Sequence, residues 1–487
     1  MAKIQSVKFN FIMNSILTVS AMIFPVITYP YVSKILGPQG IGTVSFANSV
    51  VTYFSMFAQL GIPTYGIRAC AKVRDNREEL SRVTQEILII NLITCVVSYL
   101  MFFITLQAVP QFREEKTLYL VMSAMILFNS IGAEWLYKGM EQYHYITLRS
   151  VLFKFVALVG MFLLIRQEGD YVIYGGITIF ASVGSNVLNL INLKWLVDWK
   201  PVGRYNFRRH LQPIFVFFAM SIATTVYTNM DNVMLGFIKG TTENGYYDAA
   251  VKIKNILVGV VASLGTVLLP RMAYYVQQGQ RAEFVRMTRK ALNVVVLLSV
   301  PLCVYFVAFA WPTIQVLSGV QFAPSVAPMR IIMPTLVLIG ITNILGIQIL
   351  VPTGREKQVL YSEIAGAVVN VAANSLLIPN LGAAGAAAGT LLAELVVLLV
   401  QLYALRGEVL EALWGISYWK VALATLVGLV ASWWLAGLGW HPMLVMLTSA
   451  VLFFGSYGLV MLLTRERMTV ELWKQGIDMV VGRKKHR

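Results

Sequence analysis

Several charged side chains of this sequence lie inside long apolar stretches, where an isolated charge is costly. Asp231 lies in the stretch 213–238, and Lys252 and Lys254 lie in the stretch 247–270. A charge at mid-bilayer costs roughly 2.5–3.5 kcal/mol on insertion scales, so such a residue usually faces a cavity or a partner. We expect an Asp231–lysine pair. Lys252 and Lys254 are two positions apart and therefore point to different faces of a helix. We expect that Asp231 can pair with only one of them, so that at least one positive charge is not neutralised by Asp231.

Further cations lie near the ends of apolar stretches. Lys154 is about one turn inside the stretch 150–166, and Arg149 directly precedes it; the others are Lys34, Arg68 and Arg271. Each could extend its side chain to lipid headgroups. Together with Lys252 and Lys254 they could instead line a path for an anionic substrate. Both interpretations stay open at this point.

Uncharged polar residues follow helical spacing in three stretches, so each set makes one polar stripe. The stripes include Ser185, Asn186 and Asn189, then Thr224 and Thr228, and then Asn370 and Asn374. Hydrogen bonds between helices would explain each stripe. Three stripes in one chain favour a wet central cavity. Glu394, midway along 383–405, is the preferred candidate for a buried proton or cation site, and Glu363 is another acidic candidate.

The composition requires a membrane protein. Of 487 residues, 57% are hydrophobic and 13% are charged, whereas soluble chains are about a quarter charged. The net charge of +16 fits positive-inside loops, attraction to anionic lipids or an anionic substrate, and we expect no nucleic-acid partner. The three cysteines lack metal-ligand spacing, and the four histidines are predicted in loops or tails. We therefore expect no metal or cofactor site.

Fourteen apolar stretches are long enough to span a bilayer. They are 9–35, 43–67, 84–108, 117–137, 150–166, 172–194, 213–238, 247–270, 291–311, 327–352, 359–378, 383–405, 418–437 and 442–464. With this register, most of the 39 lysines and arginines fall on one side of the membrane. The positive-inside rule then predicts that both termini are cytoplasmic.

A glycine spacing repeats between the two halves. Gly37, Gly42 and Ala47 are five apart, and so are Gly240, Gly245 and Ala250, 203 residues later. Both sets lie where one span ends outside and the next begins, as expected of tight turns and close helix packing. We therefore predict two six-helix bundles, 1–212 and 213–407, a further helix pair within 408–464, and a basic cytoplasmic tail, 465–487. Parallel repeats of this kind occur in secondary transporters, with the substrate site between the halves.

The predicted loops are short and carry no Walker A motif, dinucleotide fingerprint, HExxH motif or nucleophile elbow. An ATP-driven pump is therefore not expected. A glycan polymerase or O-acyltransferase would share the many spans, but it would need a large outside loop or a membrane-embedded catalytic histidine. We expect a transporter and not an enzyme.

Four stretches carry a resemblance to a known family: YPYVSKILGPQGIGTVSFANS (29–49), EWLYKGMEQYHYITLRSVLFK (134–154), DNVMLGFIKGTTENGYYDAA (231–250) and VLLPRMAYY (267–275). The chain resembles polysaccharide transporters of the multidrug/oligosaccharidyl-lipid/polysaccharide flippase superfamily, most closely the Wzx-type flippases. The resemblance covers essentially the whole chain. Glu134, Arg149, Lys154, Asp231 and Arg271 fall in the matching motifs.

The resemblance implies a V-shaped central cavity between two six-helix bundles, with two extra C-terminal helices. It implies alternating access that moves an undecaprenyl-pyrophosphate-linked oligosaccharide between leaflets of a bacterial cytoplasmic membrane, with H⁺ or Na⁺ as a coupling ion. A polysaccharide polymerase and glycosyltransferases would be possible partners. A lipid II or spore-wall precursor flippase and a cation-coupled multidrug exporter remain alternatives.

Overall fold

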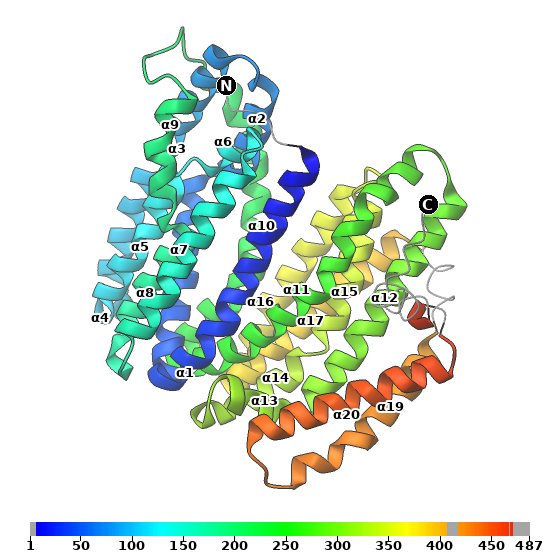
Figure 1. The fold of residues 1–487 in the computed structure, drawn as a ribbon. Helices are drawn as coiled ribbons and strands as arrows, with labels where there is room; N and C mark the ends of the chain where they lie inside the picture. The colour runs from blue at the N-terminus through cyan, green and yellow to red at the C-terminus, as the bar shows by residue number, and fades with distance from the viewer. Residues whose placement is uncertain (1–5, 407–416, 467, 471–487) are drawn as a thin grey trace. The chain divides into compact units, whose positions relative to one another are not determined.

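The computed structural model describes residues 6–406, 417–466 and 468–470, and these contain helices and no strands (Figure 1). The contacts divide the chain into two compact units, 1–248 and 249–487. The division into bundles at residue 212 stays a prediction.

The first unit is built from ten α-helices, the start of an eleventh, a 3₁₀ turn and a π-helical turn. They are α1 (Val7–Gln59), α2 (Ile62–Val73), α3 (Arg77–Ala108), α4 (Pro110–Glu114), α5 (Lys116–Ile131), α6 (Glu134–Gly139), α7 (Tyr143–Leu164), η1 (Glu168–Asp170), α8 (Tyr171–Ile179), η2 (Phe180–Gly184), α9 (Asn186–Leu196), α10 (Arg208–Lys239) and the first residues of α11 (Thr241–Gln277).

The second unit contains the rest of α11 and the helices that follow it. These are α12 (Arg281–Ala308), α13 (Ala310–Leu317), η3 (Val320–Ser325), α14 (Val326–Ile332), α15 (Thr335–Asn343), η4 (Ile344–Leu350), α16 (Glu356–Leu381), α17 (Ala383–Ala404), α19 (Tyr418–Trp433), η5 (Trp434–Gly437) and α20 (Pro442–Leu463). In this unit α16 packs along α17, and α19 packs along α20 and against α12.

Each of the fourteen predicted apolar stretches falls on helical structure, which confirms an all-α membrane fold. By length and apolarity, ten helices of the described residues could cross a membrane, or eleven if the bent pair Val320–Ile332 and Thr335–Leu350 counts as one. One of the ten, Phe9–Val73, contains two of the predicted stretches. The count of fourteen is therefore consistent with the helices but not confirmed by them.

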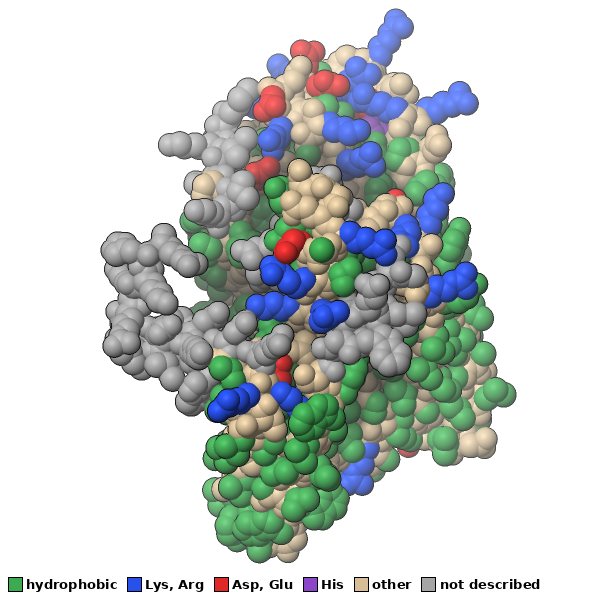
Figure 2. Space-filling view, turned by 90° about the vertical axis from the view of Figure 1, so that its right-hand side faces the viewer, with side chains coloured by type: hydrophobic (Ala, Val, Ile, Leu, Met, Phe, Trp, Pro, Cys, Tyr) green, Lys and Arg blue, Asp and Glu red, His purple; other side chains and the backbone are tan. Residues whose placement is uncertain are grey.

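The surface has the character of a protein that lies in lipid. Large apolar side chains such as Ile104, Leu376 and Val451 are 68%, 74% and 73% exposed. Exposed tryptophans lie at helix ends, including Trp195, Trp419 and Trp433, as is typical of the membrane interface. On the face drawn in Figure 2, hydrophobic side chains form broad continuous areas that carry few charges.

Among the described residues, the core of the first unit includes two clusters of buried apolar side chains. One joins α1, α3 and α5 around Phe102, Leu118 and Met122. The other joins α2, α3 and α6 around Ile62, Ile87 and Leu136. Because α3 contributes to both clusters, it is the helix against which the ends of its neighbours are positioned.

The repeated glycines have two different roles, both in the first unit. Gly37 (φ 65°, ψ −179°) and Gly240 (φ 88°, ψ 178°) form equivalent turns with a left-handed φ, which suits glycine. Gly42 and Gly245 instead allow two backbones to touch. A Cβ on Gly42 would lie 1.7 Å from the Thr241 carbonyl oxygen, and one on Gly245 would lie 1.9 Å from that of Pro38.

These contacts are related by a local pseudo-two-fold arrangement. Thr241 corresponds to Pro38 under the 203-residue offset, so each repeat places its glycine against the turn of the other. Ser45 donates a hydrogen bond to the Oδ1 atom of Asp248, its own counterpart in the repeat, at 2.9 Å. The sequence repeat therefore marks a contact between its two copies, in addition to two similar turns.

We expect Gly42→Ala to destabilise the protein by about 1–3 kcal/mol or more, because the added methyl group overlaps backbone atoms that cannot move alone. Gly458→Ala is the matched control, since a Cβ there meets nothing within 4 Å and alanine favours a helix by up to about 1 kcal/mol. Thermal unfolding of the detergent-solubilised protein measures both. Equal midpoints for the two variants would contradict the close approach.

Candidate functional site

Arg149 of α7 is the centre of a buried polar cluster in the first unit. Its Nη1 atom donates to Ser185 Oγ at 2.7 Å and to Asn186 Oδ1 at 3.2 Å, and its Nη2 atom lies 3.2 Å from Glu134 Oε2. The Arg149 residue is 3% exposed. The structure thus brings together four of the predicted site residues.

Local backbone features place the partners of Arg149. Glu134 begins α6 directly after Ala133, whose φ of 40° reverses the chain at the end of α5. The π-helical turn η2 ends directly before Ser185 and Asn186. Such wide turns are common at functional positions because they rotate the following side chains relative to a regular helix.

Glu134 lies between two cations, because its Oε1 atom is 2.8 Å from Lys138 Nζ while Oε2 contacts Arg149. The two cations, Lys138 and Arg149, thus contact the two oxygens of one carboxyl group, which holds the Arg149 guanidinium in place.

Lys154 lies further along α7 and is partly exposed. Its Nζ atom donates to Ser20 Oγ of α1 at 3.0 Å, its one recorded hydrogen bond among the described residues. Thr147 of α7 also donates to the Met13 carbonyl of α1, at 2.9 Å. Since the Lys154 ammonium has three donors, it keeps capacity for an anion, unlike Arg149, which is held by side chains of the protein.

The amides of α9 connect helices. Asn186 donates to the Phe128 carbonyl at 3.1 Å, and Asn189 donates to the Gly132 carbonyl at 2.7 Å. Both residues are buried. Asn186 adds a second donor to the Phe128 carbonyl, which also accepts from the Gly132 N–H, and Asn189 supplies a donor to the Gly132 carbonyl at the end of α5. Their predicted role as the lining of a wet cavity stays a prediction.

The polar stripe of α10 is different. Thr224 and Thr228 are exposed, and each hydroxyl donates to a carbonyl of its own helix. Asp231 is buried and accepts a hydrogen bond from the Tyr247 hydroxyl at 2.5 Å. Lys252 and Lys254 are partly buried and belong to the second unit. The pairing of Asp231 with a lysine stays a prediction.

In the second unit the predicted polar residues of α16 and α17 are buried within the helix pair. Asn374 donates to Asn370 Oδ1 at 3.1 Å. A Cβ on Gly389 would lie 2.0 Å from Asn374 Oδ1, so only glycine allows α17 to approach this amide. Glu394 is buried and Glu363 is partly buried.

The remaining predicted cations are less informative. Lys34 and Arg68 are exposed on α1 and α2. The side chain of Arg271 lies outside the part of the chain that the structure describes.

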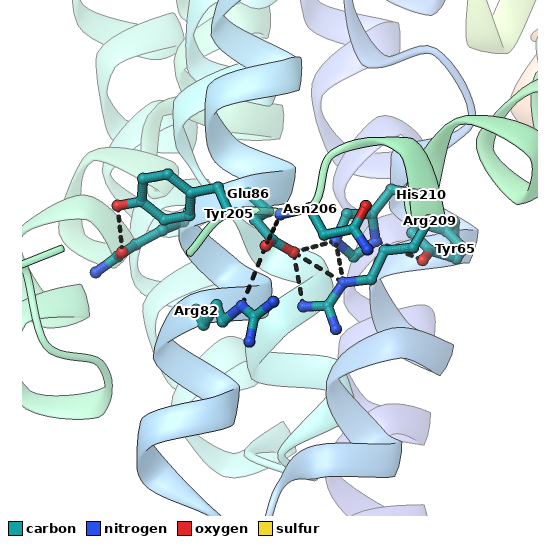
Figure 3. Close-up of polar contacts among 8 residues, drawn as sticks. Tyr65, Arg82, Glu86, Tyr205, Asn206, Arg209 and His210 are labelled. Carbon is teal, nitrogen blue, oxygen red and sulfur yellow. Dashed lines mark hydrogen bonds and ion pairs between the residues drawn. The ribbon is translucent and has the colours of Figure 1, made fainter. Parts of the chain in front are cut away.

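Sequence reasoning missed a second buried charge, Glu86 of α3 (Figure 3). Its two oxygens contact Arg82, Arg209, His210 and the backbone N–H of Asn206 at 2.6–3.3 Å. The carboxylate is fully buried. A signal was available, because Glu86 lies at the start of the stretch 84–108 with Arg82 one helical turn earlier.

The prediction that every histidine lies in a loop or tail was wrong. His144 lies in α7, and His210 is buried in the first turn of α10. The polar residues before position 213 obscured this start, since α10 begins at Arg208. The Tyr65 hydroxyl lies 2.6 Å from His210 Nδ1, and His210 Nε2 lies 2.6 Å from Glu86 Oε2.

A helical fold with exposed apolar surfaces and partnered charges inside its apolar helices is that of a polytopic membrane protein. A family model described as "Polysaccharide biosynthesis protein" matches residues 7–276. The chain therefore belongs to this family. A model described as "MatE" matches residues 217–376.

Curated relatives agree. The chain is 23% identical over 356 residues to a putative O-antigen transporter of Escherichia coli (strain K12), covering 72% of this chain and 85% of that protein. It is 22% identical over 392 residues to a putative O-antigen transporter of Shigella dysenteriae, covering 79% and 96%. These relatives are named as transporters and not as enzymes.

Solved structures confirm the fold. The inward closed conformation of the lipid II flippase MurJ matches with a TM-score of 0.75 and 14% identity, covering 94% of this chain and 99% of that one. An inward-facing multidrug resistance transporter of the MATE family matches with a TM-score of 0.64 and 14% identity, covering 83% and 99%. The chain is thus a polysaccharide transporter of the multidrug/oligosaccharidyl-lipid/polysaccharide flippase superfamily.

We expect Arg149→Gln to lower the free energy of unfolding by about 1–3 kcal/mol, because Glu134, Ser185 and Asn186 lose their shared buried partner. Lys138 still neutralises Glu134, which limits the loss. Arg74→Gln breaks an ion pair with Glu141 of which about a third is exposed, so about 0–1 kcal/mol is expected there. Chemical denaturation in detergent compares the two; a larger loss for Arg74→Gln would contradict the central role of Arg149.

Proposed function

We propose that this chain translocates undecaprenyl-pyrophosphate-linked oligosaccharide repeat units from the inner to the outer leaflet of a bacterial cytoplasmic membrane. The family match over residues 7–276 carries this proposal, supported by the two relatives named as O-antigen transporters. The products would be O-antigen, capsule or another cell-surface polysaccharide.

The residues support an anionic, sugar-bearing substrate. Lys154 retains donors on α7, and Lys252 and Lys254 add positive charge inside the apolar helix α11. Lysine and arginine bind phosphate oxygens through charge-assisted hydrogen bonds. In this proposal Arg149 is a positioning residue that Glu134 fixes, and Lys154 contacts the pyrophosphate. The lipid tail stays in the bilayer, so only the polar head needs a hydrated route.

The cycle would proceed by alternating access driven by a proton or sodium gradient. Glu363, Glu394 and Asp231 are acidic groups within apolar helices that could exchange an ion, and Glu134 is a fourth candidate. Both termini would lie in the cytoplasm, where the basic loops also lie under the positive-inside rule.

A cation-coupled multidrug exporter is the alternative that a specific observation favours, namely the MatE match over residues 217–376. A cationic drug needs an acidic or aromatic site. Lys154, Lys252 and Lys254 place cationic groups within apolar helices, and cationic groups repel such a substrate. The likeness to a lipid II flippase at 14% identity concerns the fold alone, and a lipid II or spore-wall precursor shares the lipid carrier with our proposed substrate but differs in the headgroup attached to it.

Reconstitution into liposomes tests the proposal. Lipid-linked oligosaccharide is supplied in one leaflet, and its appearance in the other is followed with a lectin or a glycosidase that cannot cross the membrane. We expect translocation that depends on an imposed ion gradient. Transport of a cationic dye, with no movement of lipid-linked glycan under proton or sodium gradients, would decide for the exporter.

We expect Lys154→Ala and Lys252→Ala each to reduce the rate of translocation about tenfold or more, because each removes a cation that is partly buried in an apolar helix. Lys194→Ala is the matched control, since this lysine is exposed at the end of α9. Membrane abundance is measured alongside. If both variants translocate substrate at the full rate, Lys154 and Lys252 do not bind the substrate and have a structural role only.

A further inference from the structure

The Glu86 cluster holds two arginines in a fixed geometry. Arg82, one turn earlier on α3, directs Nε to Glu86 Oε1 at 3.3 Å, and Arg209 of α10 directs Nε and Nη2 to Oε2 at 3.0 and 2.7 Å. Figure 3 shows the two guanidinium groups next to each other beside the carboxylate. One carboxylate between two guanidinium groups leaves a net positive charge, whatever the protonation state of His210.

Both arginines keep donors that point away from Glu86. A guanidinium has five N–H donors, and Glu86 engages only Nε of Arg82, and Nε and Nη2 of Arg209. Among the described residues, neither Nη atom of Arg82 has a hydrogen-bond partner, and Nη1 of Arg209 has none either. The two side chains are 33% and 32% exposed, so solvent or a headgroup can reach these donors.

The segment between α9 and α10, which leads into Arg209, is hydrogen-bonded to α3 next to Glu86. Asp198 N–H donates to Ser81 Oγ at 2.9 Å, and Gln85 Nε2 donates to the carbonyls of Asp198 and Lys200 at 2.5 and 3.0 Å. Tyr205 donates to Gln85 Oε1 at 2.8 Å. This segment, which the sequence predicts to be a loop between the halves, is thus bound along the first turns of α3.

His210 and Tyr65 also hold Glu86 in place, because His210 contacts the Glu86 carboxylate and Tyr65 contacts His210. The His210 Nε2 atom contacts Glu86 Oε2 and lies 3.3 Å from Arg209 Nε, while Nδ1 contacts the Tyr65 hydroxyl, so both ring nitrogens of His210 have partners. Glu86 is therefore held by α2, α3 and α10 together. A binding group that is held in this way loses little conformational entropy when it takes up a ligand.

We propose that Arg82 and Arg209 form an anion site for a phosphate ester headgroup, specifically the diphosphate of the lipid carrier before it enters the transport path. The assignment to the carrier rests on the proposed function. Two adjacent guanidinium groups match the oxygens of a diphosphate through paired N–H donors. The site lies at the end of α3 that the positive-inside rule places in the cytoplasm. Glu86 is a positioning residue that orients both arginines.

Direct binding tests the site. The purified full chain in detergent is titrated with farnesyl diphosphate by calorimetry. We expect Arg82→Gln with Arg209→Gln to weaken binding at least tenfold, and Arg82→Lys with Arg209→Lys to weaken it less, because lysine keeps the charge but lacks the planar donor pair. Unchanged affinity in both double variants would overturn the proposal.

Arg77→Gln is the matched control for charge. Arg77 lies on the same end of α3, and its partner is Asp198, in an ion pair that is about half exposed. We expect its affinity for farnesyl diphosphate to stay within twofold of the unmodified protein. An equal loss for Arg77→Gln and Arg82→Gln would mean general electrostatic attraction and would overturn a built site. Unfolding temperatures identify variants that fail to fold; the lysine variants then carry the test.

Competition identifies the source of the phosphate. Inorganic pyrophosphate and nanodiscs containing phosphatidylglycerol are each added against farnesyl diphosphate. Preference for farnesyl diphosphate supports the carrier. Equal competition by phosphatidylglycerol would assign the site to bulk lipid, and equal competition by inorganic pyrophosphate would assign it to a soluble anion; either result overturns the carrier assignment.

The translocation assay separates this inference from the proposed function. If the unmodified protein moves no lipid-linked glycan, the proposed function fails while the binding titration still reports on the site. If translocation succeeds, the glutamine double variant should need at least a fivefold higher substrate concentration for half-maximal rate. An unchanged half-saturating concentration would overturn the role of the site in substrate entry.

Discussion

A polar group buried within a membrane protein is costly unless it finds a partner inside the protein, because the lipid around it offers none. That constraint explains why the described residues are helical, since a helix satisfies its own backbone. It also explains the side chains. Arg149 binds an acid, a hydroxyl and an amide, and Glu86 binds two arginines, a histidine and a backbone N–H. These polar clusters connect helix ends that the apolar core also packs together.

The sequence allowed the fold to be predicted because its signals are long. The apolar stretches, the uneven distribution of lysine and arginine between the two sides, and the glycine repeat each extend over many residues. A wrong interpretation of one residue therefore does not change the predicted fold. The helix ends were less predictable. The start of α10 at Arg208 lies in a basic, polar segment, so hydropathy placed His210 outside the helix although it is buried there.

The candidate site was predictable in part. Arg149, Glu134, Ser185 and Asn186 attracted attention through residue type and position, and they do lie together. The different roles of Arg149 and Lys154 could not be predicted, because they depend on which hydrogen-bond donors are already used. Arg149 donates to neighbouring side chains of the protein, whereas Lys154 donates to a single serine. Glu86 was missed because its main partner, Arg209, lies 123 residues away, and no local pattern connects them.

Gly42 and Gly245 also bear on the history of the chain. Each abuts the turn that the other repeat contributes, at the carbonyls of Thr241 and Pro38. If Gly42 or Gly245 were replaced by a larger residue, its side chain would overlap the backbone of the other repeat. A smaller residue in the other repeat could not relieve this overlap, because backbone atoms are present in every residue. If the halves arose by duplication, most positions could change independently in the two copies. Positions 42 and 245 instead had to remain glycine once the two copies packed together.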